Sequence, residues 1–213
     1  MNPNQIDAKK TAVLFFDILN GYYHEASEKA RARKKPMVEG AVRLMKIGRE
    51  AGIPIFFAKG NHRSDTATSV TLLTDTKIDL TPWPDGVPVK DRPVAVEGSS
   101  GAEVIPELDP RPDDYYIPKY RWSAFFQTYL DLALRAGKID TLLISGGSTD
   151  VGLAATVFAA RDLDYNLVIV RDACASVHDQ RAHDVLMDLM FPRMARVRTT
   201  DQVAQMIKQG RDK

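Results

Sequence analysis

Short apolar segments alternate with longer amphipathic segments along most of the chain. The first apolar segment, TAVLFF at residues 11–16, carries no charged residue, and comparable segments recur toward the C-terminal end. Short and nearly continuous apolar runs are typical of parallel strands that are buried on both faces. We therefore predict strands at residues 11–16, 53–58, 115–118, 141–145, 167–171 and 195–198.

The segments between these strands have the spacing of amphipathic helices. We predict helices at residues 37–51, 101–108, 123–135, 151–163, 179–190 and from 201 onward. Gly52 stands where a glycine often ends a helix, and Ser123 is a candidate N-cap. Residues 60–100 contain several Pro and Gly. A loop of that length in a compact domain is usually functional or mobile, and we expect it to set specificity.

Alternation of strands and helices throughout the chain indicates an α/β fold. We expect a doubly wound, mainly parallel sheet of six strands with helices on both faces, in a Rossmann-like three-layer arrangement. The 213 residues fit a single domain, with a core from about residue 11 to residue 207. In such sheets ligands bind beyond the carboxyl ends of the strands. This rule selects as candidates Asp17, Gly60, Asn61, Lys119, the turn at 146–152 and Asp172.

Composition and charge narrow the classes of partner. The net charge is +1 at pH 7, so no basic excess points to nucleic acid or to an anionic membrane. The basic run RARKK at residues 31–35 is more typical of a solvated helix face. No apolar stretch approaches the ~18 residues of a membrane helix, and the first residues lack the apolar region of a signal peptide. Because Cys174 is the single cysteine, no disulfide can form within the chain, and we expect a cytoplasmic protein.

Polar residues that follow two of the predicted strands are candidates for chemistry. Asp17 ends an apolar strand, where a partly buried carboxylate suits acid or base catalysis, although one that caps the next turn would stand in the same place. Lys119 and Arg121 could together hold a substrate carboxylate, or could be solvated loop residues. Trp122 and Phe125 could line a pocket, but aromatic residues at this spacing are more often part of a core.

The sequence GGSTDVG at residues 146–152 joins a predicted strand to a predicted helix. Such a turn presents free backbone N–H groups and the positive end of a helix, so it could bind an anion or stabilise an oxyanion. Its candidate substrate contacts are Ser148, Thr149, Asp150 and Val151. The alternative is a glycine turn in which Thr149 or Asp150 is an ordinary N-cap, and the motif matches neither a dinucleotide fingerprint nor a P-loop.

The order of these pieces resembles the isochorismatase-like hydrolases of the cysteine hydrolase superfamily. The matching segments are AVLFFD, AGIPIFF, GAEVIPEL, IPKYRWSAF, GGSTDVG and RDACAS, and the resemblance extends over about residues 11–207. The resemblance implies the doubly wound sheet, places Asp17 and Lys119 at the catalytic Asp and Lys, and places Gly152 at the nucleophilic cysteine. Glycine there cannot form a thiol acyl-enzyme. The resemblance also implies a homo-oligomer, with Trp83 a candidate for the interface, and a small-molecule substrate without a cofactor.

Glycine at the nucleophile position resembles the true isochorismatases, which hydrolyse a vinyl ether without a thiol. The resemblance then implies that Asp17 protonates the vinyl carbon, that water attacks the resulting oxocarbenium ion, and that Lys119 holds a carboxylate or stabilises developing charge. The chain departs from isochorismatases at Gly60, where they carry Gln, and at Asp150, where they carry His.

Two further features of the sequence bear on the substrate. Asn61 or His62 could supply the polar contact that is missing at the preceding position. The segment Thr149-Asp150-Val151 is more similar to the amide-hydrolysing branch of the family. Three functions therefore stay open: hydrolysis of a vinyl ether or similar acid-labile bond, hydrolysis of an amide, imide or ureide by water that Asp17 activates, and binding of a small molecule without catalysis.

The remaining candidate residues are expected to have structural roles. Cys174 lies past the next strand and is expected to be a small buried side chain rather than a substitute nucleophile. No metal site is expected, because the residues before His62 lack the Asp-x-His pattern of the zinc-binding nicotinamidase branch. His178 and His183 are five residues apart and do not share a helix face. Together with Asp179 and Asp184 they are more typical of a solvated helix surface.

Overall fold

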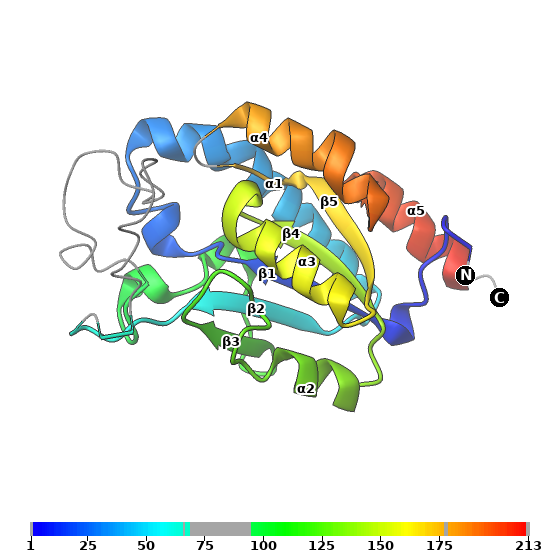
Figure 1. The fold of residues 1–213 in the computed structure, drawn as a ribbon, viewed down its shortest axis with the longest axis horizontal. Helices are drawn as coiled ribbons and strands as arrows, with labels where there is room; N and C mark the ends of the chain where they lie inside the picture. Colours follow the sequence, from blue (N-terminus) through cyan, green and yellow to red (C-terminus); the bar gives the residue numbers. More distant parts are fainter. Residues whose placement is uncertain (1, 66, 69–94, 177–178, 212–213) are drawn as a thin grey trace.

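The computed structural model describes residues 2–65, 67–68, 95–176 and 179–211 (Figure 1). Within these ranges the chain forms a parallel sheet of six strands in the order β3-β2-β1-β4-β5-β6, which confirms the predicted fold class. The strands are β1 (Thr11–Phe16), β2 (Ile55–Gly60), β3 (Tyr115–Lys119), β4 (Thr141–Gly146), β5 (Asn166–Cys174) and β6 (Arg196–Arg198). Each strand was predicted, and β5 extends further toward its carboxyl end than the apolar run indicated.

The chain reverses its winding direction at β1, which lies between β2 and β4. The register pairs Phe16 with Ala58 of β2 and with Gly146 of β4. After β1 the chain continues to β2, toward one edge of the sheet. After β4 it continues to β5, toward the opposite edge. In open α/β sheets such a switch point leaves a crevice at the carboxyl ends of the strands, where ligands bind.

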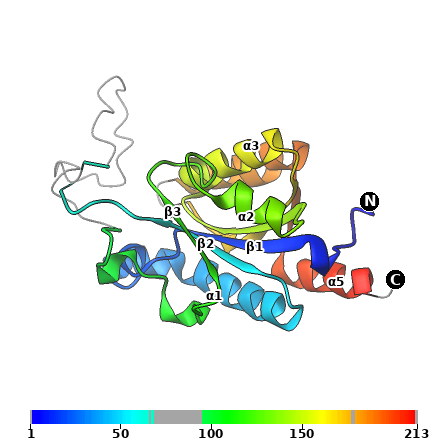
Figure 2. The same cartoon turned by 90° about the horizontal axis from the view of Figure 1, so that it is seen from below.

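Helices cover both faces of the sheet (Figure 2). Helices α1 (Glu28–Glu50) and α5 (Thr200–Arg211) lie on one face, and α2 (Leu130–Ala136) and α3 (Ala154–Asp162) lie on the other. In β1, Val13 and Phe15 pack into the core beneath α1, while Leu14 and Phe16 pack into the core beneath α2 and α3. Because both faces are buried, the strands carry apolar residues without alternation.

Helix α1 begins nine residues earlier than the predicted start at residue 37, since it starts at Glu28. Ser27 caps it, with its Oγ accepting a hydrogen bond from the N–H of Ala30 at 3.3 Å. The first turns carry mostly exposed polar residues and the helix contains Pro36, so neither apolar spacing nor proline placement revealed this part. The basic run at residues 31–35 lies here, on a largely exposed stretch of helix.

Two predicted helices are wrong over most of their length. The segment at residues 123–129 forms turns, and α2 begins only at Leu130, because Gln127 adopts a positive φ of 55° and the N–H of Ala124 donates to the Thr156 hydroxyl on α3. Residues 101–108 form two 3₁₀ turns, Ser100–Ala102 and Pro106–Leu108. Between these turns Val104 pairs with Leu19 in an isolated bridge.

The other predicted helices are present, and two of them contain a π-helical turn. The turn Thr149–Leu153 precedes α3, and the turn Leu186–Met190 follows α4 (Gln180–Val185). Met187 and Phe191 after α4 join the core on the α2 and α3 side of the sheet. The first of these π-helical turns lies at the switch point and contains position 152.

A buried ion pair ties the start of β3 to α1. Arg49 contacts Asp114 through two nitrogen atoms, at 2.5 and 2.6 Å, and the Asp114 side chain is only 2% exposed. Asp114 directly precedes β3, the strand that ends in Lys119. Removing one partner of a buried pair leaves an uncompensated charge, which is far more costly than removing an exposed pair.

We expect the substitution Arg49→Met to lower the free energy of unfolding by about 3–5 kcal/mol, because the Asp114 carboxylate would lose its buried cation. The matched control is Lys35→Met, which removes the exposed partner of Glu39 at 4.0 Å and should cost no more than about 1 kcal/mol. Urea denaturation followed by circular dichroism measures both values. Equal losses in the two variants would contradict the assigned role of the buried pair.

Candidate active site

Asp17 is the first residue after β1, and its backbone turns sharply there with a φ of 51°. Its N–H donates to the carbonyl of Ala58 at 2.9 Å, which continues the pairing of β1 with β2. Its side-chain Oδ1 accepts a hydrogen bond from the N–H of Gly60 at 3.0 Å. The carboxylate is therefore held at the carboxyl end of β2 by main-chain atoms.

Lys119 is the last residue of β3 and reaches the same carboxylate. Its Nζ lies 2.5 Å from Asp17 Oδ2, and the two side chains are 8% and 12% exposed. The ammonium also lies 4.4 Å from the centroid of the Phe16 ring, which is within the range of a cation–π contact. The structure thus brings Asp17 and Lys119 together at the switch point, as expected from the sequence, while their catalytic roles stay a prediction.

The turn after β4 is held between β1 and β5 by main-chain hydrogen bonds. The N–H of Gly147 donates to the carbonyl of Phe16 at 3.1 Å, and the N–H of Thr149 donates to the carbonyl of Ala175 at 3.0 Å. Gly146 has a φ of 120°, and a Cβ on it would lie 2.0 Å from the Phe16 carbonyl oxygen. The peptide bond between Gly147 and Ser148 is cis. Only glycine fits at position 146, where the main chain approaches the Phe16 carbonyl so closely.

The polar side chains of the turn are engaged within the turn and with its neighbours. Asp150 accepts hydrogen bonds from the hydroxyls of Ser148 and Ser176. The Thr149 hydroxyl lies 3.0 Å from Nδ1 of His183 on α4, and both side chains are buried. Burial lowers the pKa of His183, which favours the neutral ring in this contact. These interactions anchor the turn from the helical side.

His183 corrects the expectation of a solvated histidine surface on this helix. Its side chain is buried and faces inward, on the same side as Met187, which lies one helical turn further on and is buried in the core. The spacing of His183 and Met187 was the signal in the sequence for this inward face. His178 lies outside the described residues.

The segment after β3 contributes less to the site than predicted. The Phe125 ring packs against Tyr165 with centroids 5.7 Å apart, and its role as a substrate contact stays a prediction. Tyr165 directly precedes β5, at the edge of the sheet opposite the carboxyl ends. Arg121 is exposed and donates to the carbonyls of Thr68 and Tyr120, and Trp122 is 45% exposed.

The segment after β2 lies beside the ion pair. The N–H of Asn61 donates to the carbonyl of Lys119 at 3.2 Å, so Asn61 is attached to the end of β3 through its backbone. His62 follows and is half-buried. Its Nδ1 has no hydrogen-bond partner among the residues that are described. Burial and the nearby Lys119 ammonium lower the pKa of His62. The lowered pKa favours a neutral imidazole at His62.

A side chain at position 152 would require the Phe16 ring to move. A Cβ on Gly152 would lie 2.5 and 2.6 Å from Cζ and Cε1 of Phe16, distances that real Cβ atoms do not show. On another side it would lie 3.2 Å from the carbonyl oxygen of Trp122. Val151, the neighbouring residue, is half-buried, and its N–H donates to the Ser148 carbonyl.

Two other candidates from the sequence have structural roles. Asp172 lies within β5, and its two carboxylate oxygens accept hydrogen bonds from the N–H and the hydroxyl of Thr200, which begins α5. Cys174 ends β5, with its Sγ 3.8 Å from the carbonyl of Ile144. Burial raises the pKa of the Cys174 thiol to about 12, so it is not ionised at neutral pH.

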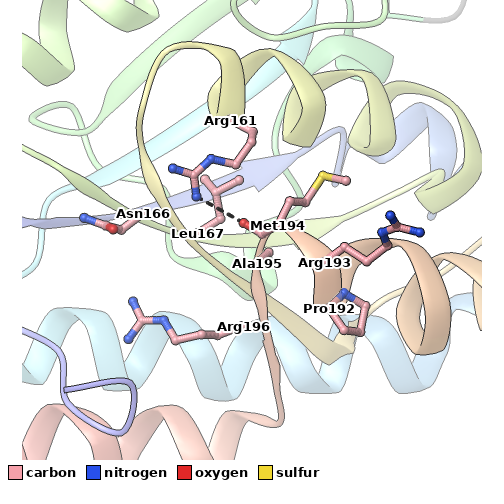
Figure 3. A pocket seen from close by; sticks show the side chains of 8 residues that line it. All are labelled: Arg161, Asn166, Leu167, Pro192, Arg193, Met194, Ala195 and Arg196. Carbon is pink, nitrogen blue, oxygen red and sulfur yellow. Dashed lines mark hydrogen bonds between the residues drawn. The ribbon is translucent and has the colours of Figure 1, made fainter. Parts of the chain in front are cut away.

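A cavity of about 400 Å³ lies elsewhere on the molecule (Figure 3). It is lined by Arg161, Asn166, Leu167, Pro192, Arg193, Met194, Ala195 and Arg196, residues around the amino ends of β5 and β6. Two of these arginines donate hydrogen bonds to backbone carbonyls. Arg161 donates to the carbonyl of Met194, as the dashed line in Figure 3 shows, and Arg196 donates to the carbonyl of Gln5. This cavity is at the edge of the sheet opposite the ion pair.

Within the described ranges, no three His, Cys, Asp or Glu side chains are grouped so as to hold a metal ion. None of the helices in these ranges has the length and apolar character needed to cross a membrane. The candidate site consists of Asp17, Lys119, the neighbouring segment with His62, and the turn after β4.

Comparison with known proteins agrees with this geometry. The model of the isochorismatase domain matches residues 11–202. The chain belongs to the isochorismatase family. The family protein YecD of Escherichia coli O157:H7 is 29% identical over 207 residues, which cover 93% of this chain and 97% of the relative. Ureidoacrylate amidohydrolase RutB of Acinetobacter baylyi is 27% identical over 190 residues, covering 86% of this isochorismatase-family chain and 78% of RutB.

The fold is shared with solved structures of the family. An isochorismatase family protein from Burkholderia thailandensis superimposes with a TM-score of 0.78 at 22% identity, covering 96% of this chain and 98% of that one. At this identity the likeness establishes the fold alone. The substrate of this isochorismatase-family protein has to be argued from its own residues.

We expect the Cys174 thiol to resist alkylation in the folded protein, because it is buried and un-ionised. Ellman's reagent at pH 8 should report far less than one reactive thiol per chain, and one thiol after unfolding in urea. Cys174→Ser should leave the reaction of the folded protein with the reagent at background. Rapid, stoichiometric reaction of the native thiol that substrate prevents would place Cys174 in the site instead.

Proposed function

We propose that this isochorismatase-family protein is a hydrolase without a cysteine nucleophile, which cleaves a vinyl ether or a related bond in a small carboxylated substrate. The observation that carries the proposal is the combination of a buried Asp17–Lys119 contact with a glycine at position 152, where a Cβ would overlap the Phe16 ring. An acyl-enzyme cannot form at that position. Acid–base hydrolysis needs only Asp17, Lys119 and water.

Asp17 is the proposed acid, and Lys119 is the proposed carboxylate-binding group. In the free protein these side chains pair with each other. A substrate carboxylate competes for the ammonium, and an anion beside Asp17 favours the protonated carboxyl group. Asp17 then gives its proton to the vinyl carbon, and water adds to the oxocarbenium carbon that results. The hemiketal breaks down to an alcohol and a carbonyl compound, so one water is consumed for each ether cleaved.

A second candidate, hydrolysis of an amide, imide or ureide, is favoured by the hydrogen bonds of Asp17. In the free protein the carboxylate accepts from the Gly60 N–H and from Lys119, and an ionised carboxylate can take a proton from an attacking water. RutB is by name a ureidoacrylate amidohydrolase. A small-molecule binding protein without turnover is the third candidate.

With isochorismate as the probe we expect pyruvate to be released, and with a panel of small amides and ureides we expect no ammonia. Asp17→Asn removes the proton donor and should lower pyruvate release by about 10²–10⁴-fold. The matched control is Cys174→Ser, which changes a buried side chain outside the ion pair and should keep nearly full activity. Circular dichroism verifies that both variants fold.

The pH dependence separates the two enzymatic candidates. The vinyl-ether route needs Asp17 protonated, so the rate should decline as pH rises. The amidase route needs Asp17 ionised, so its rate should increase with pH over the same range. Ammonia without pyruvate, abolished by Asp17→Asn, would establish the amidase instead. Tight binding of a small acid with neither product would establish the binding protein.

We also propose that the protein is a homo-oligomer. Large apolar side chains stand exposed along the helical layer that contains α2, α3 and α4, and such surfaces often mark interfaces. Leu132 is 72% exposed and Leu189 is 64% exposed. The others on this layer are Trp122, Phe126, Tyr129, Phe158, Val185 and Met190. Trp83, the interface candidate named from the sequence, lies outside the described residues.

Light scattering at micromolar concentration should give a mass that is a multiple of one chain. The double substitution Leu132→Lys with Leu189→Lys should shift the protein toward smaller particles, because it places charges in the proposed apolar interface. Val42→Lys on α1, where Val42 is 36% exposed, is the matched control and should leave the mass unchanged. A wild-type particle with the mass of a single chain would remove the proposal.

A further inference from the structure

The ring of Phe16 lies where the side chain of residue 152 would be. Its atoms Cζ and Cε1 are 2.5 and 2.6 Å from an ideal Cβ on Gly152. The glycine itself is buried and is part of the π-helical turn that precedes α3. The absence of a side chain at position 152 is thus matched by a large side chain at position 16.

The ring has little freedom to move aside. Phe16 is 1% exposed and packs in the core with Ile117, Leu153 and Ala154. Its backbone is paired with Ala58 on one side and with Gly146 on the other. The core is close-packed, so a displaced ring would have to displace its neighbours as well.

The same ring lies beside Lys119. The ammonium is 4.4 Å from the ring centroid and 2.5 Å from Asp17 Oδ2. The Lys119 ammonium therefore contacts both the Phe16 ring and the Asp17 carboxylate, which belong to adjacent residues. A cation held over a desolvated aromatic face is stabilised more than one at an exposed site.

We propose that Phe16 is a positioning residue of this site, which occupies the space of the missing nucleophile side chain and holds the Lys119 ammonium against Asp17. Exclusion of a side chain at position 152 is then a property of residue 16 as much as of Gly152. The catalytic consequence of Phe16 rests on the proposed function, whereas its steric and positioning roles do not. Its test therefore uses stability and spectroscopy, which report on Phe16 even if the substrate is different.

The first measurement is a double-mutant cycle on thermal stability. Gly152 lies in a helical turn and does not have a positive φ, so alanine is acceptable to the backbone there. We nevertheless expect Gly152→Ala to lower the Tm by roughly 4 °C or more, because its Cβ overlaps the ring. In a Phe16→Leu background the same change should lower the Tm by less than half as much, since leucine lacks the two ring atoms concerned.

Gly137→Ala is the control for this cycle. A Cβ on Gly137 would meet its neighbours only at ordinary contact distances of 3.4–3.6 Å, so its effect on Tm should be the same in both backgrounds. Equal effects of Gly152→Ala in the two backgrounds would overturn the steric role of Phe16. If Phe16→Leu does not fold, Phe16→Ile provides a ring-free background that suits a strand.

The second measurement tests the position of Lys119. In protein with ¹³C-labelled lysine, the ε-methylene protons of Lys119, assigned by their loss in Lys119→Met, should be shifted upfield by the ring. Phe16→Leu should abolish this shift. Lys34, which lies 5.9 Å from the ring of Tyr22, is the matched lysine and should be unaffected. An unchanged Lys119 signal in Phe16→Leu would overturn the positioning role, whatever the substrate of the enzyme is.

Discussion

A buried ion pair between Asp17 and Lys119 is the interaction around which the carboxyl edge of the sheet is organised. Removing two charges from water costs several kcal/mol for each ion, which is offset only when pairing and hydrogen bonding are good. Here the ammonium contacts Oδ2 and the Gly60 N–H satisfies Oδ1. That geometry requires β1, β2 and β3 to end at the same level, which their parallel register provides by pairing Phe16 with Ala58 and Gly60 with Lys119.

The other side of the crevice is built by a different means. The turn after β4 carries no charge pair and is held by main-chain bonds to Phe16 and Ala175. Behind it, side-chain hydrogen bonds link Thr149 to His183 and Ser176 to the Asp150 carboxylate. Asp172, a third carboxylate near this edge, is used instead to cap α5. The site therefore has the buried ion pair on one side and the glycine-rich turn after β4 on the other.

The sequence predicted the fold more completely than the site. Buried parallel strands are short and wholly apolar, so each strand could be located, and the rule for strand ends then selected Asp17 and Lys119. The same uniformity concealed Phe16, because a core phenylalanine in TAVLFF carries no sign of what its ring contacts. Phe125 was assigned to the pocket because its residue type does not reveal which way its side chain points. The helix that the apolar spacing predicted there is interrupted at Gln127, which has a positive φ. The inward position of His183 could be predicted only from its spacing to Met187.

The ion pair also bears on whether the site is catalytic or only structural. A buried pair is weak evidence for stability, since apolar residues of similar volume often serve a core as well or better. The surroundings of Lys119 are apolar on the side of Phe16 and Ile117, so the fold itself could accommodate an uncharged residue there. Yet the carboxylate and the ammonium are both present, beside a half-buried histidine and at the switch point where ligands bind in such sheets. Unlike the Arg49–Asp114 pair, this pair lies at the switch point, and that supports chemistry at Asp17 despite the glycine at position 152.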